Sequence, residues 1–251
     1  MAAPSEDVDE HLSKIFTPVG FEYYPFKIGW YNEIVDPIFK LDYPDDTLAY
    51  IIVSTPGMFE KAFVPYVCRL NAEDARDPVD QCIDLYYQKV KEAFPDHDIE
   101  VIHDYDLHAN RRPKILVQTA GHVAGAAYYY QRKDVKNDPW EKDQKIFGVS
   151  VHPLFGGWFG FRGVIIFKDI QKIELEKKEP VDCIQGDELR IQVLEKFTYH
   201  WADNSFRDII PVVEKYSDEQ KVYFNTLPAE RRKLLESLGI KIGQQDSCKE
   251  T

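Results

Sequence analysis

Apolar residues recur three or four positions apart in several stretches of the chain, which is the spacing of one helix face. The clearest stripes lie in residues 7–16 and 78–94. Ser217 followed by Gln220 has the pattern of a capping box, and Pro228 and Gly239 frame a last helix. Helices are therefore expected at residues 7–16, 58–66, 78–94, 114–130, 189–197, 217–224 and 228–238.

Other apolar stretches have the patterns of strands. Residues 48–55 form a continuous apolar run that ends at a proline, as in a buried strand. Residues 99–106 alternate between apolar and polar, which predicts a strand with one covered face. Two further strands are expected at 147–151 and 163–167, paired as a hairpin across a broad loop. The charged residues 170–186 are expected to form an exposed connection.

Small residues alternate with aromatic ones between residues 113 and 162. The segment AGHVAGAA (120–127) has little bulk, so a neighbouring helix or a large flat ligand could approach its backbone closely. Its glycines, Gly121 and Gly125, each weaken a helix by about 1 kcal/mol relative to alanine, so a close contact must compensate. Two interpretations remain open: a deep ligand pocket, or a tightly packed core helix followed by a glycine-rich strand.

Composition narrows the class of protein. A hydrophobic content of 44% is that of a globular chain, and the net charge of −12 argues against nonspecific nucleic-acid binding, which needs Lys and Arg to neutralise phosphates. The acidic N-terminus lacks the apolar run of a signal peptide. Four scattered cysteines suggest free thiols in a reducing compartment. We expect a cytoplasmic protein with a single domain over 1–240 and a flexible tail over 241–251.

The common catalytic signatures are absent from the sequence. There is no Walker loop, Rossmann glycine pattern or nucleophile elbow. His122 could ligate a metal, but no second ligand lies three or four residues away, so a core or pocket histidine is the better interpretation. Any catalysis would therefore come from a bound cofactor or co-substrate.

Three arginines offer a more specific signal. Arg162, Arg207 and Arg231 lie in different segments, each beside aromatic or turn residues. The guanidinium fork is suited to carboxylates and phosphates. Ordinary surface salt bridges are the alternative, because such pairs are common.

Five motifs occur in order and at the spacing of a known family. They are DPVDQC, NRRPKILVQTA, HVAGAAYYYQR, HPLFGGWFGFRG and YSDEQKVYF. Through them, residues 16–238 closely resemble the CblC family, that is, methylmalonic aciduria and homocystinuria type C. The resemblance implies an α+β sandwich similar to flavin-dependent nitroreductases, with a central mixed or antiparallel sheet flanked by helices and elaborated for cobalamin (vitamin B12).

The same resemblance implies an enzyme that removes the upper ligand of base-off cobalamin. Alkylcobalamins would be dealkylated by glutathione, and cyanocobalamin would be reductively decyanated with electrons from glutathione or a reduced flavin, FMN or FAD. No catalytic side chain is implied, since the chemistry lies at cobalt and the thiolate. The implied glutathione contacts are Arg162, Arg207 and Arg231. The implied cobalamin contacts are His122, Gly125, Tyr130, Gln131, Ser150, Gly156, Gly157 and Trp158.

Expected partners are the type D adaptor of the same pathway and methionine synthase, with neither nucleic acid nor membrane. Two alternatives remain open. One is a non-catalytic cobalamin chaperone, which would bind the vitamin without glutathione-dependent turnover. The other is a plain flavin reductase, which would oxidise a nicotinamide without needing cobalamin.

Overall fold

The structure is a computed structural model that describes residues 5–70, 77–240 and 242–243. The chain divides into two compact units. The first comprises Met1–Tyr23, Ser54–Asp96 and Tyr216–Thr251, and the second comprises Tyr24–Val53 and His97–Lys215. The single domain expected over 1–240 stays a prediction. The expected tail, 241–251, lies outside the described residues apart from 242 and 243.

The first unit is built from helices. They are α1 (Ser5–Phe16), a π-helical turn (Phe59–Phe63) that continues into α3 (Val64–Arg69), α4 (Pro78–Ala93), α7 (Asp218–Asn225) and α8 (Arg231–Ser237). Leu12 of α1 and Val90 of α4 are fully buried, as the apolar stripes predicted, and α1 packs against α4. The helices predicted at 7–16, 58–66 and 78–94 are confirmed.

Helix α7 is held by its cap and by aromatic packing. Ser217 accepts a hydrogen bond from the backbone N–H of Gln220 at 3.2 Å, which is the expected N-cap. The side chain of Gln220 is buried, and its Oε1 has no hydrogen-bond partner, so the second half of the predicted capping box is not formed. Tyr223 is buried against Phe63, with ring centroids 4.9 Å apart.

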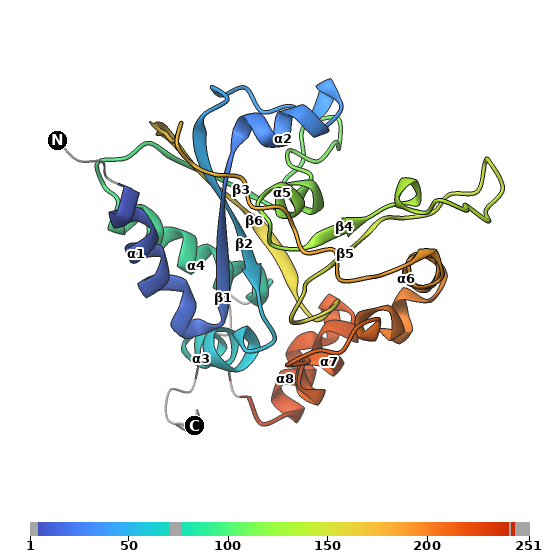
Figure 1. The fold of residues 1–251 in the computed structure, drawn as a ribbon. Coiled ribbons are helices and arrows are strands. Elements are labelled where there is room, and N and C mark those ends of the chain that lie inside the picture. The colour runs from blue at the N-terminus through green and yellow to red at the C-terminus, as the bar shows by residue number, and fades with distance from the viewer. Residues whose placement is uncertain (1–4, 71–76, 241, 244–251) are drawn as a thin grey trace. The chain divides into compact units, whose positions relative to one another are not determined.

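A four-stranded sheet forms the centre of the second unit. Its strands are β1 (Phe21–Lys27), β2 (Thr47–Ser54), β6 (Gly160–Gln171) and β3 (Ile99–His103), in that order across the sheet (Figure 1). β3 runs antiparallel to β6, with Ile102 opposite Val164. Every residue of β2 is buried, as its continuous apolar run predicted. The α+β class and the antiparallel pairing are confirmed.

Two short helices cover one face of this sheet. They are α2 (Ile28–Ile34) and α5 (Val117–Val123), which contact each other. Ala120 of α5 lies with Ile51 of β2 and Val164 of β6 in one buried cluster. The small alanine lets the α5 backbone come close to the sheet.

The long helix predicted at 114–130 forms only over Val117–Val123 and is wrong on either side. Helix α5 ends at Val123 because Gly125 adopts a left-handed conformation, with φ +78°, which stops a helix. The tyrosines that follow form β4 (Tyr128–Tyr130), in keeping with the strand preference of aromatic residues. In Figure 1, α5 leads directly into β4.

The hairpin predicted between 147–151 and 163–167 is also wrong. β5 (Val149–Val151) pairs antiparallel with β4, whereas β6 joins the four-stranded sheet. The broad loop between β5 and β6 therefore connects two sheets. A connection without helix or strand is confirmed over 172–186, but it is exposed only in part, because Pro180 and Ile184 are buried. The predicted helix at 189–197 is part of α6 (Asp187–His200).

Cys82 and Cys183 are free thiols, but Cys68 is disulfide-bonded, so the expectation of free thiols is wrong for Cys68. Spacing along the chain carries no information on which cysteines a fold brings together. Cys248 lies outside the described residues. The helices of the described ranges are too short or too polar to span a bilayer.

Gly121 tests the packing of α5. A Cβ added there would collide with the ring of Phe161. Alanine normally favours a helix by about 1 kcal/mol over glycine, but here overpacking should dominate and lower the free energy of unfolding by about 1–3 kcal/mol. Urea unfolding of Gly121→Ala checks this.

Gly57→Ala is the matched control, because an added Cβ there would meet only the flexible Lys61 side chain at 3.4 Å or more. A Gly121→Ala protein as stable as the Gly57→Ala protein would contradict the packing.

Candidate functional site

His122 lies at the end of α5, where the chain turns back toward β4. Its Nδ1 accepts a hydrogen bond from the backbone N–H of Tyr129 at 3.1 Å. The rings of His122 and Tyr128 are nearly perpendicular, with their centroids 4.9 Å apart. Burial lowers the pKa of His122, so the ring is neutral at pH 7. With Nδ1 accepting, the ring proton sits on Nε2, and His122 offers a ligand one N–H donor.

Gly125 makes the turn between His122 and β4. Its φ of +78° favours glycine, and a Cβ there would lie 2.6 Å from the carbonyl oxygen of Lys178. The backbone at Gly125 is therefore packed against the 172–186 connection. This packing holds His122 and the following tyrosines in one arrangement.

Ser150 lies beside this turn on β5. It pairs with Tyr129 of β4, and only 8% of its surface is exposed. Its hydroxyl is the feature of interest, because Oγ is enclosed and has no hydrogen-bond partner in the described structure. A buried hydroxyl without a partner is unfavourable by about 1–3 kcal/mol, so this atom is suited to a polar group supplied by a ligand.

Tyr130 supports β4 from within the core. It is fully buried, and its hydroxyl donates to Asp182 Oδ1 at 2.7 Å and accepts from the Ile184 N–H at 2.8 Å. Burial, together with the bond to Asp182, raises the pKa of Tyr130. Because its hydroxyl is occupied in this way, contact between Tyr130 and a ligand stays a prediction.

Gln131 begins the short 3-10 helix Arg132–Asp134. Its backbone N–H donates to Asp134 Oδ2 at 2.7 Å, and the two residues form a reciprocal cap. The cap fixes the exit of the chain from β4. The Gln131 side chain is half-buried.

Gly156 and Gly157 form a second group with Arg207. His152 and Gly156 exchange backbone hydrogen bonds of 2.8 and 2.9 Å, which closes a tight turn. A Cβ at Gly156 would collide with the carbonyl oxygen of Arg207, and one at Gly157 would lie 2.8 Å from the Arg207 Cα. The backbone of residues 204–208 fills the space beside these glycines. At Gly156 and Gly157, close packing of the chain therefore explains the small residues.

Arg207 clamps this glycine turn. Its guanidinium donates to the Gly157 carbonyl and, through Nε at 2.9 Å, to Asn204 Oδ1. It also lies 5.4 Å from the ring centroid of Trp158. The indole N–H of Trp158 donates to Asp208 at 2.6 Å. The structure therefore brings Gly156, Gly157, Trp158 and Arg207 together.

Arg162 lies near the start of β6, close to Asp104. Partial desolvation raises the pKa of Asp104, and the charge of Arg162 acts in the opposite direction. Phe161 and Val164 both pack against the buried cluster that contains α5. Side chains three positions apart in a regular strand point to opposite faces, so the strand must be irregular between these two residues. Gly163, with φ +122° and no room for a Cβ beside Ile102, produces this irregularity.

Arg231 belongs to the first unit. Its guanidinium lies 5.0 Å from the ring centroid of Tyr223, and Nε donates to the Thr226 carbonyl at 3.1 Å. These contacts hold the arginine against α7. Its placement beside the other two arginines stays a prediction.

Several supporting residues escaped the sequence analysis. Asp182, Asn204 and Asp208 fix Tyr130, Arg207 and Trp158, respectively. Only Asn204 carried a local signal, because asparagine between polar residues often adopts the left-handed conformation that it has here, φ 60°. In the described ranges, His, Cys, Asp and Glu form no group of three that could hold a metal ion.

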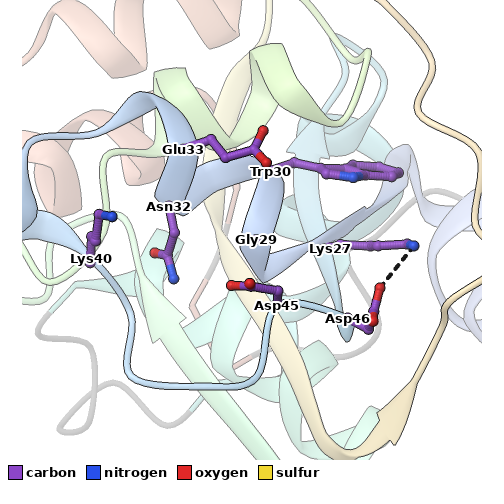
Figure 2. A pocket seen from close by; sticks show the side chains of 8 residues that line it. All are labelled: Lys27, Gly29, Trp30, Asn32, Glu33, Lys40, Asp45 and Asp46. Atoms are coloured by element: carbon purple, nitrogen blue, oxygen red, sulfur yellow. Dashed lines mark hydrogen bonds and ion pairs between the residues drawn. The ribbon is translucent and has the colours of Figure 1, made fainter.

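Two pockets of the second unit lie apart from these residues. The first, of about 300 Å³, is lined by Lys27, Gly29, Trp30, Asn32, Glu33, Lys40, Asp45 and Asp46 (Figure 2). Figure 2 shows Lys27 paired with Asp46 beside the Trp30 ring. The second, of about 270 Å³, is lined by residues 38–43, 100, 102, 108 and 114. Neither pocket contains a predicted site residue.

Comparisons with known proteins agree on one family. The model of the methylmalonic aciduria and homocystinuria type C family matches residues 20–235. A Gallus gallus protein named cyanocobalamin reductase / alkylcobalamin dealkylase is 55% identical, over 92% of this chain and 96% of its own. The Homo sapiens protein of that name is 48% identical, over 91% of this chain and 81% of its own.

The chain is also similar to a solved structure. The crystal structure of a Caenorhabditis elegans B12-trafficking protein, CblC, superposes with a TM-score of 0.82 at 34% sequence identity. The match covers 92% of this chain and 95% of the other.

Removing the Tyr130 hydroxyl tests whether its hydrogen bonds to residues 182 and 184 stabilise β4. Tyr130→Phe removes a donor to Asp182 and an acceptor for Ile184, so the free energy of unfolding should fall by about 1–3 kcal/mol. Chemical denaturation measures this. Tyr129→Phe is the control, and equal effects of the two substitutions would contradict the assigned role.

Proposed function

The chain belongs to the methylmalonic aciduria and homocystinuria type C family, and we propose that it removes the upper axial ligand of cobalamin. It acts as an alkylcobalamin dealkylase and a cyanocobalamin reductase. The observation that carries this proposal is the 55% identity to the Gallus gallus enzyme of that name, over nearly the whole length of both chains.

In the dealkylation, the thiolate of glutathione attacks the carbon bound to cobalt. A carbon–sulfur bond forms as the cobalt–carbon bond breaks, and both electrons of the broken bond stay on the metal. The products are a thioether and cob(I)alamin. In the decyanation, an electron donor reduces the cobalt of cyanocobalamin and cyanide leaves. Glutathione is the donor that the arginines favour.

The protein's part is binding, orientation and electrostatics. Arg162 is proposed to hold a carboxylate of glutathione, because a guanidinium offers two parallel donors to that group. Arg207 has a second duty, since it already clamps the glycine turn through Gly157. Arg231 is the third proposed contact. Fixed positive charges near the thiol also lower its pKa, which favours the thiolate.

The α5–β4–β5 segment is proposed to contact cobalamin, which binds with its base detached from cobalt. His122 offers an N–H donor, and Ser150 offers an enclosed hydroxyl without a partner. Gly125 lets the backbone pass close by, and Gln131 is half-buried at the end of β4. Gly156, Gly157 and Trp158 contribute by shape, since Arg207 occupies the space beside both glycines.

The finer parts of the family resemblance are also proposals. They are the nitroreductase-like ancestry of the fold, the cytoplasmic location, and the type D adaptor and methionine synthase as partners. FMN or FAD is a further proposed electron carrier, but the two pockets described above are lined by mixed charges, and we assign no residues to a flavin.

The substitution Ser150→Ala should affect stability and substrate binding differently. Ser150→Ala removes an enclosed hydroxyl that lacks a partner, so the free protein should be as stable as the parent or more stable, by up to about 1 kcal/mol. If this hydroxyl bonds cobalamin, affinity should fall roughly tenfold, the equivalent of about 1.4 kcal/mol. Thermal unfolding and absorbance titration with hydroxocobalamin measure the two effects. Unchanged affinity would remove Ser150 from the site.

An anaerobic absorbance time course with methylcobalamin tests the function itself. The proposal predicts cob(I)alamin and S-methylglutathione, formed only when protein and glutathione are both present. A shift to the base-off spectrum without a thiol-dependent change would instead identify a carrier, a role consistent with the similarity to the C. elegans B12-trafficking protein. Nicotinamide oxidation without cobalamin would identify a flavin reductase.

A further inference from the structure

The last residue of β3, His103, and the turn that follows it bring together ionisable side chains that the proposed reaction has not used, among them Asp104 and Asp106. Asp106 and His103 interact with each other. Asp106 Oδ2 accepts from the His103 backbone N–H at 3.0 Å and lies 3.5 Å from its ring Nδ1. The Asp106 carbonyl also accepts from the Lys114 N–H at 2.9 Å. Asp106 is therefore a structural residue of this turn.

Asp104 is placed differently. The β3–β6 ladder ends at the pair His103 and Gly163. Continuing the antiparallel register by one residue brings Asp104, the first residue of the turn, opposite Arg162. Burial of the Asp104 carboxyl raises its pKa and the charge of Arg162 lowers it, so the two charges interact.

We propose that Asp104 is the internal counter-ion of Arg162 and that it restricts the site to thiols that carry a carboxylate. It is a positioning residue that acts through Arg162. In the free protein, its carboxylate interacts with the charge of the guanidinium. When the co-substrate binds, the carboxylate of the ligand takes over this interaction. The inference rests on the proposed function, in which Arg162 holds glutathione.

The selectivity follows from competition for one guanidinium. A neutral thiol has nothing to exchange for Asp104 and gains no energy from Arg162. A carboxylate can form two parallel charge-assisted hydrogen bonds with the guanidinium, which compensates for displacing a partly exposed acid. Removing the charge at residue 104 should therefore strengthen the binding of carboxylate ligands and leave neutral ligands unaffected.

Asp104→Asn tests the proposal in protein loaded with cyanocobalamin. The probe is S-methylglutathione, which keeps both carboxylates but has no thiol to react, and binding is measured by calorimetry. We expect its affinity to rise about twofold to fivefold, the range of an exposed ion pair. The diethyl ester of the probe should bind Asp104→Asn and parent protein equally. Asp143→Asn, the same charge change at an exposed residue of this unit, should have no effect.

A double-mutant cycle separates this role from a structural one. In an Arg162→Gln background, Asp104→Asn should no longer change the affinity, because the shared partner is gone. An equal gain in affinity in the Arg162→Gln background would overturn the proposal. So would an affinity of the Asp104→Asn protein that is equal to or lower than that of the parent. Asp104→Ser provides a second variant if the asparagine protein folds poorly. Parent protein that fails to bind the probe would overturn the proposed glutathione role together with this inference.

Discussion

The site depends on one close contact, in which the ring of Phe161 occupies the space that a side chain at residue 121 would need. This contact sets α5 against β6. Each partner precedes a proposed binding residue, because His122 follows Gly121 and Arg162 follows Phe161. One packing constraint therefore positions two residues that we propose as ligand contacts, one on the helix for cobalamin and one on the strand for glutathione. The helix propensity given up at Gly121 is the cost of that coupling.

Arg207 shows how a single residue can serve both architecture and binding. Its backbone fills the space beside Gly156 and Gly157, and its guanidinium bonds the Gly157 carbonyl. Replacing it would disturb the glycine turn as well as any ligand, so loss of activity in such a variant is poor evidence for a direct contact. Arg162, which lies on β6 outside that turn, is the better residue for isolating the role of a guanidinium in thiol binding.

Sequence patterns predicted the elements whose signals are local. The stripe of α4 and the apolar run of β2 each identify an element without knowledge of its neighbours. The extent of α5 and the pairing of β5 with β4 were missed, because both follow from the backbone conformation of Gly125. The family motifs identified the candidate residues. Sequence patterns could not show that the Ser150 hydroxyl is enclosed without a partner, or that the charges of Asp104 and Arg162 interact, because both conditions depend on residues far apart in the sequence.

The proposed contact between cobalamin and the α5–β4–β5 segment can be tested by hydrogen–deuterium exchange of the chain with and without hydroxocobalamin. We expect slower exchange in residues 117–131 and 149–151 when the substrate is bound. Protection that spares these residues and falls on the pocket lined by Lys27 and Trp30 would contradict it.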